Sequence, residues 1–361
     1  MDKKSKSPPA AKRLIAPPRE WGITGWLKCK WVFIGVVLAG AFLFFFFSNG
    51  PIPSEKKVPK KEIVRGWAKM SGNKQGKVIF AQPPKMMILN LKTGITKEVP
   101  GVITEGECTP KGLVRRTLRR LKGPLPRGYS PRPSWSPDGK RFLYRYKGSI
   151  YACDEQGNKK KIKNNRMDCS YETRWSWRVE NGEDWALGPS KKGNVIQVKI
   201  NDPTVVKTVY AGGDVVKHCE MTGTGTHIVY ARKRDIFVAA VGSKSKEESR
   251  KISHGQSCRP CAAPDNRVAW LPVPHERYFI HDATSGKETG VLHAPPPPPP
   301  PPKKREIYRL NWSNHPDFAV HMYGSECIEY IHVRRISTGE HLFIGSGWDP
   351  DLWIEIKKSS G

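Results

Sequence analysis

The densest group of candidate ligand-binding side chains is a run of four arginines. Arg115, Arg116, Arg119 and Arg120 lie in the stretch "LVRRTLRRLKGPLPRGYSPR" (113–132). Guanidinium groups bind phosphate, sulfate and carboxylate groups through two parallel hydrogen bonds, and this spacing would place the four on one face of a short helix. The run therefore predicts an anion-binding face. The alternative is a solvated loop, which is the usual state of such charge runs.

Two further stretches contain residue types that bind metals. His315 lies in "SNHPDF" (313–318), where it could contact a ligand or a metal, although the pattern favours an ordinary Asn-His-Pro-Asp turn. Cys258 and Cys261 have the spacing of half a zinc site, but no second cysteine pair and no nearby histidine ligand accompany them. The sequence therefore predicts no metal and no cofactor, and His315 joins the four arginines as a candidate ligand-binding residue.

Catalytic signatures are sparse. Ser346 stands in "GSG", which lacks the Gly-x-Ser-x-Gly spacing of a hydrolase nucleophile. Asp138, Asp265 and Asp317 occupy turn positions, where capping of the turn explains them. The sequence therefore favours a protein that is not an enzyme. The alternative is a carbohydrate hydrolase or lyase, which requires two or three clustered carboxylates with shifted pKa values.

The chain has eight cysteines, and Cys29 lies just before a long apolar segment. Cys169, Cys219 and Cys258 each lie near the start of a predicted strand, a repeated placement that is typical of small buried apolar residues. Disulfides are the alternative in an exported domain. Pairing is left open among the other seven, which are Cys108, Cys153, Cys169, Cys219, Cys258, Cys261 and Cys327.

Short strands joined by turns must position these residues. Hydrophobic residues make up 37% of the 361 residues, which include 33 Gly and 32 Pro, and this composition favours many strands and turns over long helices. The sharpest strand–turn–strand pattern is "SWSPDGKRFLY" (134–144). Pro137 fixes φ, Asp138 caps the turn and Gly139 takes the position that needs a positive φ.

The same pattern recurs along the chain. Residues 139–152 align without a gap on residues 225–238. Further copies are marked by Trp175-Ser176, aligned with Trp135-Ser136, by Pro264-Asp265-Asn266 and by Trp312-Ser313. A sixth unit has strands at 77–81 and 86–94 but lacks its first strand, which "WDPDLWIEI" (348–356) could supply. Units of about 40–50 residues with four strands each are typical of propeller blades. The sequence therefore predicts an all-β, six-bladed β-propeller closed by its last strand, with five or seven blades as the alternatives because the inserts obscure two blade boundaries.

The best-preserved unit resembles a known repeat. "PSWSPDGKRFLYRYKGSIYACDEQGNKKKI" (133–162) is similar to the WD40-like repeat of TolB-type propellers. The resemblance implies a TolB-like propeller over residues 76–356, with inserts at 103–132 and 294–304. The Tol–Pal function is not carried over, because the chain has no counterpart of the N-terminal α/β domain of TolB. Repeats of this kind also occur in exported proteins with unrelated ligands.

The N-terminal region contains a predicted membrane-spanning segment. "WVFIGVVLAGAFLFFFF" (31–47) is uncharged and long enough to span a bilayer as a helix. A cleaved signal peptide is the alternative, but the preceding 30 residues are long for its n-region. We predict a basic cytoplasmic tail (1–30), an uncleaved signal-anchor transmembrane helix (31–47) and a Pro- and Lys-rich stalk (48–75). Lysines after the span do not favour this orientation, so the topology is open.

The net charge of +29 indicates acidic partners. Residues 1–50 contribute +6, so +23 lies in the rest of the chain. Such an excess attracts anionic polysaccharide, acidic proteins, lipid headgroups or nucleic acid, although a solvated basic surface is the alternative. We predict a single-pass membrane protein whose propeller lies in the periplasm as a binding or scaffold module. Its partner would be an anionic polysaccharide or an envelope protein. A nucleic-acid partner would require the opposite topology.

Overall fold

The computed structural model describes residues 58–104, 131–170, 173–215, 218–293, 306–325 and 328–356. All of them belong to one compact unit of the chain, Ser54–Gly361. The predicted tail and transmembrane segment, most of both inserts, and Arg115, Arg116, Arg119 and Arg120 lie outside these residues. Within the described ranges, no helix combines the length and the apolar composition that crossing a bilayer requires.

The described residues form six four-stranded antiparallel sheets, which are the blades of a propeller. Blade 1 consists of β24 (Trp348–Ile354), β1 (Gly76–Gln82), β2 (Lys85–Asn90) and β3 (Ile95–Ile103). Blade 2 consists of β4 (Ser134–Trp135), β5 (Arg141–Tyr146), β6 (Ser149–Asp154) and β7 (Lys159–Ile162). Blade 3 consists of β8 (Ser176–Glu180), β9 (Glu183–Pro189), β10 (Val195–Lys199) and β11 (Val206–Tyr210).

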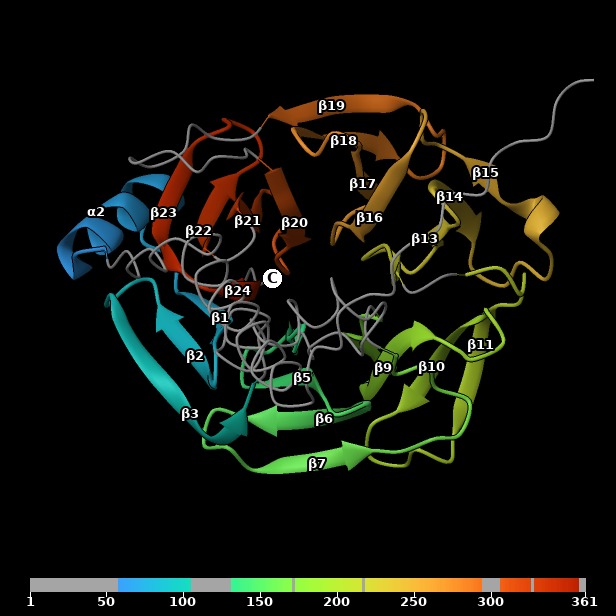
Figure 1. Cartoon of the computed structure of the whole chain (residues 1–361), viewed down its shortest axis with the longest axis horizontal. Coiled ribbons are helices and arrows are strands. Elements are labelled where there is room, and N and C mark those ends of the chain that lie inside the picture. The colour runs from blue at the N-terminus through green and yellow to red at the C-terminus, as the bar shows by residue number, and fades with distance from the viewer. Residues whose placement is uncertain are drawn as a thin grey trace, which may run out of the picture. The chain divides into compact units, whose positions relative to one another are not determined.

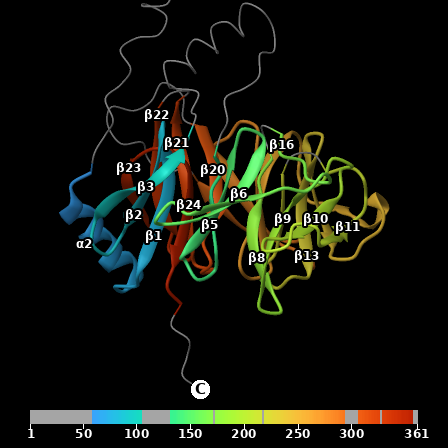
Figure 2. The ribbon, with the colours of Figure 1, turned by 90° about the horizontal axis from the view of Figure 1, so that it is seen from below.

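Blades 4 to 6 repeat this order. Blade 4 consists of β12 (Cys219–Met221), β13 (His227–Arg232), β14 (Asp235–Ala240) and β15 (Arg250–Lys251), with a short 3-10 helix, Lys246–Glu248, before its last strand. Blade 5 consists of β16 (Ser257–Ala262), β17 (Arg267–Pro272), β18 (Arg277–Asp282) and β19 (Glu288–His293). Blade 6 consists of β20 (Glu306–Trp312), β21 (Phe318–Ser325), β22 (Ile328–Arg335) and β23 (His341–Ser346). Figure 1 looks down the axis that the six blades surround, and Figure 2 shows them from the side.

The last strand closes the ring, as the sequence predicted. β24 pairs with β1, with Leu352 opposite Val78 and Asp351 opposite Ile79. Blade 1 therefore takes its axial strand from the end of the chain and its other three strands from the beginning. Such closure leaves no axial strand unpaired, which removes an edge that could pair with another chain.

The hairpin in "SWSPDGKRFLY" has the predicted turn. The amide of Ser136 donates to the carbonyl of Arg141 at 2.8 Å, and the carboxylate of Asp138 accepts a hydrogen bond from the amide of Lys140 at 3.1 Å. Gly139 has a φ of 65°, a conformation that glycine adopts at little cost. A side chain at Gly139 would also collide with the ring of Trp353 from blade 1. The turn of blade 2 thus contacts the closing strand.

One helix replaces part of the predicted stalk. Residues Lys60–Ser71 form α2, in which Ile63, Trp67 and Met70 are buried against residues of blades 6 and 1. The Trp67 indole donates to the carbonyl of Lys74 at 2.7 Å, and its ring lies 5.5 Å from that of Phe318. The prediction of a stalk over residues 48–75 is therefore wrong for this part, because an apolar stripe holds the helix on the propeller.

The described cysteines are free thiols. Cys153, Cys219 and Cys261 are buried in the clusters between blades, and Cys169 and Cys258 are half-buried. The interpretation of Cys169, Cys219 and Cys258 as small buried residues is therefore supported for Cys219, whereas Cys169 and Cys258 are only half-buried. Cys29, Cys108 and Cys327 lie outside the described residues.

Candidate axial binding site

Strand register places one polar or thiol side chain of each blade at an equivalent position on its axial strand. In each blade this residue lies opposite a buried apolar residue of the next strand. The pairs are Ser134–Leu143, Ser176–Leu187, Glu220–Val229, Cys261–Ala269, Asn311–Val320 and Asp351–Ile79. We call Ser134, Ser176, Glu220, Cys261, Asn311 and Asp351 the second axial ring.

The second axial ring joins neighbouring blades. Asp351 of blade 1 accepts a hydrogen bond from the amide of Trp135 in blade 2 at 2.8 Å. In the same way Ser134 accepts from the amide of Trp177 in blade 3 at 3.2 Å, and Glu220 accepts from the amide of Ala262 in blade 5 at 2.8 Å. The same bond recurs at three blade junctions, which supports the equivalence of the positions.

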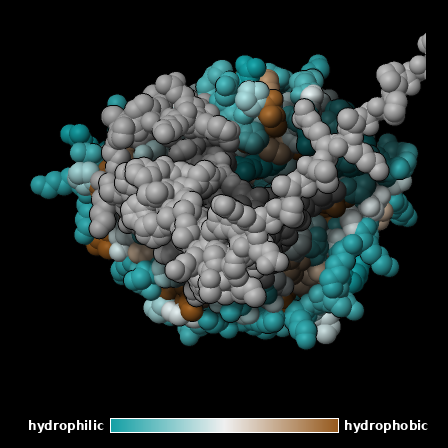
Figure 3. Space-filling view, viewed as in Figure 1, coloured by the Kyte–Doolittle hydropathy of each residue, from teal (hydrophilic) through white to brown (hydrophobic). Residues whose placement is uncertain are grey.

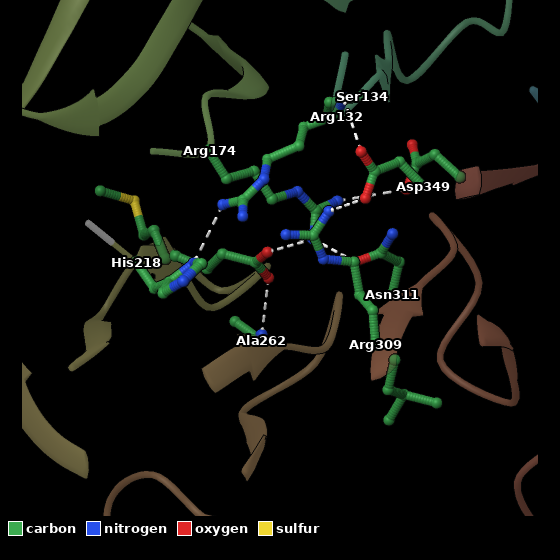
Figure 4. Close-up of polar contacts among 12 residues, drawn as sticks. Arg132, Ser134, Arg174, His218, Ala262, Arg309, Asn311 and Asp349 are labelled. Carbon is green, nitrogen blue, oxygen red and sulfur yellow. Dashed lines mark hydrogen bonds and ion pairs between the residues drawn. The ribbon is translucent and has the colours of Figure 1, made fainter. Parts of the chain in front are cut away.

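A second set of equivalent residues lies two positions earlier in the chain, either on the axial strand or just before it. We call Arg132, Arg174, His218, Arg259, Arg309 and Asp349 the first axial ring. Four of the six are arginines. Arg132, His218 and Arg259 are partly exposed, whereas the other three are buried. Figure 4 shows that side chains of both rings converge from different blades on the axis.

Arg174 crosses the axis. Its guanidinium donates to Glu220 of blade 4 and to Asn311 of blade 6, and it lies 3.2 Å from a carboxylate oxygen of Asp351 in blade 1. Blades 3 and 6 lie on opposite sides of a six-bladed ring, so the contact with Asn311 spans it. The carboxylates and the amide oxygen thus share one guanidinium, which satisfies most of its donors.

Asp349 binds two other members of the first axial ring. Its carboxylate accepts from the Arg309 guanidinium at 2.6 Å and from the Arg132 amide at 3.4 Å. The Arg132 guanidinium lies 3.4 Å from the Nδ1 atom of His218. Arg132, Arg259 and Asp349 have φ values of 44°, 53° and 49°. Non-glycine residues adopt such values rarely, and they concentrate at functional sites.

The axial region has an excess of positive charge. Burial and the nearby Arg309 hold the pKa of Arg132 well below its usual value, against the opposing effect of Asp349. Burial also lowers the pKa of Arg309, and the positive charges of Arg174 and Arg259 lower it further. Arg145, which is buried, adds a fifth guanidinium near Arg132. In the described part of the axial region, arginines therefore outnumber the carboxylates of Glu220, Asp349 and Asp351.

Burial raises the pKa of the Asp351 carboxyl to about 7, although Arg174 and the Trp135 amide favour its ionised form. Asp351 and Glu220 both contact the Arg174 guanidinium, so two carboxylates come together at the axis. Each of these carboxylates, however, is also bonded to the backbone of the next blade. Bonds that fix the fold account for both side chains without catalysis.

The residues singled out from the sequence lie elsewhere. His315 is in the turn between β20 and β21, where its Nδ1 accepts a hydrogen bond from the Asp317 amide at 3.2 Å. Burial lowers the pKa of His315. In the described part of the chain, no group of three or more His, Cys, Asp or Glu side chains is placed to hold a metal. The four arginines of the insert lie outside the described residues.

Sequence reasoning missed the axial rings. One signal was available, because three positions of the first axial ring precede a proline, in Arg132-Pro133, Arg259-Pro260 and Asp349-Pro350. The predicted alignment of Trp175-Ser176 with Trp135-Ser136 hid the pattern. Strand register instead makes Ser176 equivalent to Ser134. With this alignment, Arg174 takes the position in blade 3 that Arg132 has in blade 2.

Comparisons with known proteins bear on the fold. No family model matches the chain, and no curated protein matches it. Among solved structures, TolB from Acinetobacter baumannii is 13% identical with a TM-score of 0.47, over 81% of this chain and 71% of that one. A TolB structure from Agrobacterium tumefaciens is 11% identical with a TM-score of 0.47, over 78% of this chain and 98% of that one.

A nidogen/laminin complex contains a further similar chain, which is 9% identical with a TM-score of 0.49, over 78% of this chain and 99% of that one. Similarities of this size carry no argument about ligands or partners, and the fold itself follows from the strand pairing. The chain is a six-bladed β-propeller.

Proposed function

We propose that this propeller is a binding module for an anionic partner, either an acidic polysaccharide or an acidic segment of an envelope protein. The observation that carries the proposal is the first axial ring, in which five of six equivalent positions hold Arg or His. Arg132, His218 and Arg259 are partly exposed, and the exposed parts of these residues would contact the ligand, although the Nε atom of Arg132 is buried.

Charge would provide most of the recognition. Arg174 and Arg309 are held by Glu220, Asp351 and Asp349, and the other arginines of the axial region would add their positive charge to the attraction of an anionic ligand. Guanidinium groups match carboxylate and sulfate oxygens in pairs, and charge-assisted bonds are about twice as strong as neutral ones. On the face shown in Figure 3, the described surface is largely hydrophilic with scattered apolar residues, which suits a charged ligand.

Stacking of the ligand on tryptophan has less support. Seven of the nine described tryptophans are buried, namely Trp67, Trp135, Trp175, Trp177, Trp185, Trp270 and Trp312. Their rings pack between blades or against α2, so they add to the rigidity of the platform. The proposed recognition therefore rests on the arginines.

The test is calorimetric titration of the full chain, in detergent, with polyglutamate and with a sulfated oligosaccharide. Arg132→Gln and Arg259→Gln should each weaken binding about tenfold, which corresponds to ~1.4 kcal/mol. Arg277→Gln is the matched control, because it removes the same charge from an exposed residue of β18, away from the axial strands. Equal losses in all three variants would show non-specific attraction and would overturn the proposal.

The membrane anchor and the periplasmic location of the propeller are part of the same proposal, and the sequence of residues 31–47 supports them. Protease should leave the propeller intact in whole cells. It should digest the propeller once the outer membrane is permeabilised, without lysis of the cells. Protection until lysis would place the propeller in the cytoplasm. The basic axial region would then favour a nucleic-acid partner, with binding that falls steeply as salt rises.

A second candidate function is carbohydrate hydrolysis or lyase action, which the raised pKa of Asp351 and the nearby Glu220 favour. Asp351→Asn would abolish turnover of an acidic polysaccharide if Asp351 transfers a proton in the reaction. Polysaccharide binding without cleavage by the unmodified protein would exclude this function and leave the binding proposal standing.

A further inference from the structure

A thiol and an imidazole lie in contact at the start of blade 5. Cys258 is in β16 and His275 is in the turn between β17 and β18, and the Sγ atom lies 3.2 Å from the Nε2 atom. Both residues are half-buried, so solvent reaches them. The pairing is tertiary, because strand register places Cys258 opposite Leu271 and the following turn brings His275 back to the thiol.

The other described cysteines have different surroundings. Burial raises the pKa of Cys153 and of Cys169 to about 11, and it raises the pKa of Cys219 and Cys261 as well. A thiol reacts as its thiolate, so these four are expected to be inert near neutral pH. Cys169 is half-buried like Cys258, which makes it the natural comparison.

We infer that Cys258 and His275 form a reactive thiol–imidazole pair that undergoes exchange with small disulfides. His275 accepts the thiol proton, and the Cys258 thiolate attacks one sulfur of the disulfide. The disulfide bond of the small molecule breaks, a new bond joins Cys258 to one half, and the other half leaves as a thiolate that takes up a proton. No external oxidant is needed, because the disulfide itself is the electron acceptor.

The position of the pair gives it a charge preference. Arg259 follows Cys258 directly in the chain and belongs to the first axial ring. Its positive charge lowers the pKa of Arg309, another member of that ring. A positive potential favours anionic reactants. Disulfides that carry carboxylates should therefore react faster than neutral or cationic ones. This part of the inference rests on the proposed function, whereas the reactivity of the thiol does not.

The first experiment measures alkylation by iodoacetamide at pH 7 in the full chain, with each cysteine followed by peptide mass spectrometry. Cys258 should react at least tenfold faster than Cys169. His275→Gln should slow Cys258 to within about threefold of Cys169, because the amide fills the site but does not accept the proton. His275→Ala should do the same, and an unchanged circular dichroism spectrum would show that both variants fold.

Similar rates at Cys258 and Cys169 would overturn the inference, and so would a fast rate that does not depend on His275. A second experiment compares oxidised glutathione, hydroxyethyl disulfide and cystamine as anionic, neutral and cationic probes. Oxidised glutathione should react fastest, and Arg259→Gln should reduce the ratio of the oxidised glutathione rate to the cystamine rate, with each rate divided by the iodoacetamide rate of the same variant. If His275 dependence holds but no preference is found, the thiol pair stands and the proposal of an anion-binding axial site is contradicted.

Discussion

The most constrained residue of the propeller is Arg174. It is 8% exposed, and its side chain touches blades 4, 6 and 1 from blade 3. Desolvation by burial lowers the pKa of Arg174, but the negative charges of Glu220 and Asp351 raise it by more, so this pKa lies above its usual value. The charge is therefore retained in the interior, where three neighbours depend on it.

Replacing Arg174 should destabilise the whole propeller. In Arg174→Met the carboxylates of Glu220 and Asp351 lose their partner, and breaking a buried ion pair from one side costs on the order of 3–5 kcal/mol. Lys207→Gln is the control, since its 2.6 Å ion pair with Glu180 is exposed and should contribute about 1 kcal/mol or less. Urea unfolding measures both. A loss in Arg174→Met as small as that in the control would contradict the structural role.

At the scale of elements, three neighbouring strands of blade 6 each contribute one histidine to a cluster. His321 of β21 is the cross-strand partner of His332 in β22, and their rings stack at 5.4 Å. His341 of β23 lies 5.7 Å from His332. Both nitrogens of His332 and the Nε2 atom of His321 are buried without a hydrogen-bond partner among the described residues. The cluster is thus built for neutral rings.

The stability of the protein should therefore fall in mild acid. Burial, His341 and Arg334 lower the pKa of His332 to about 3, and burial with its neighbours lowers that of His321 and of His341. The unfolded chain binds protons below a pH of about 6.5 that the folded chain does not, so the free energy of unfolding decreases as pH falls from about 6.5 towards 3. His332 alone should contribute about 2 kcal/mol of loss between pH 7 and pH 5.

Urea unfolding at pH 7 and pH 5 measures this loss, and His332→Phe isolates the contribution of the histidine. The phenylalanine ring can pack beside Phe343, which lies 5.2 Å from His332. The variant should lose about 2 kcal/mol less than the unmodified protein between the two pH values. Identical pH dependence in both proteins would show that other groups, such as the carboxylates, cause the loss.

The elements differ in how well their sequence predicts them. The blades were predictable because the turn of residues 136–141 needs Pro, Asp and Gly at fixed positions, so "SPDGK" marks one hairpin clearly and the weaker copies can be aligned on it. Helix α2 was missed because Ile63, Trp67 and Met70 are separated by a mixture of residue types that includes Arg65, Gly66 and Lys69. Their spacing of four and three residues is helical, but three apolar residues form a weak signal in a segment with many lysines.

The axial site could not be derived in the same way. Glu220, Asn311 and Asp351 lie far apart in the sequence and meet only because six strands converge on one axis. A shift of two residues in the alignment of one blade moves a side chain to a different level of the ring. The hairpin of blade 3 is longer than that of blade 2, since Trp177 pairs with Ala186 and Trp135 with Phe142. Hairpin length depends on side-chain packing between blades, and the repeat pattern in the sequence does not predict it.

At the scale of the whole molecule, β24 makes the ring a closed structure. Leu352 and Ile354 are buried in the cluster that joins blades 6 and 1 and that also contains Trp67 of α2. Asp349 and Asp351 lie on the same strand. A single segment therefore closes the ring, supplies two of the three axial carboxylates and completes the surface on which α2 packs.

Removal of residues 348–361 should therefore open the ring. β1 would lose its axial partner, and an unpaired strand edge tends to pair with other chains. The truncated protein should form oligomers in size-exclusion chromatography and lose cooperative unfolding. A protein that lacks only residues 357–361 is the control, because it keeps β24, and it should behave like the full chain.

A synthetic peptide with the sequence "WDPDLWIEI" should bind the open edge by strand addition and restore the monomer. A monomeric truncated protein with an unchanged unfolding midpoint would show that the other five blades and α2 hold the ring together without the closing strand.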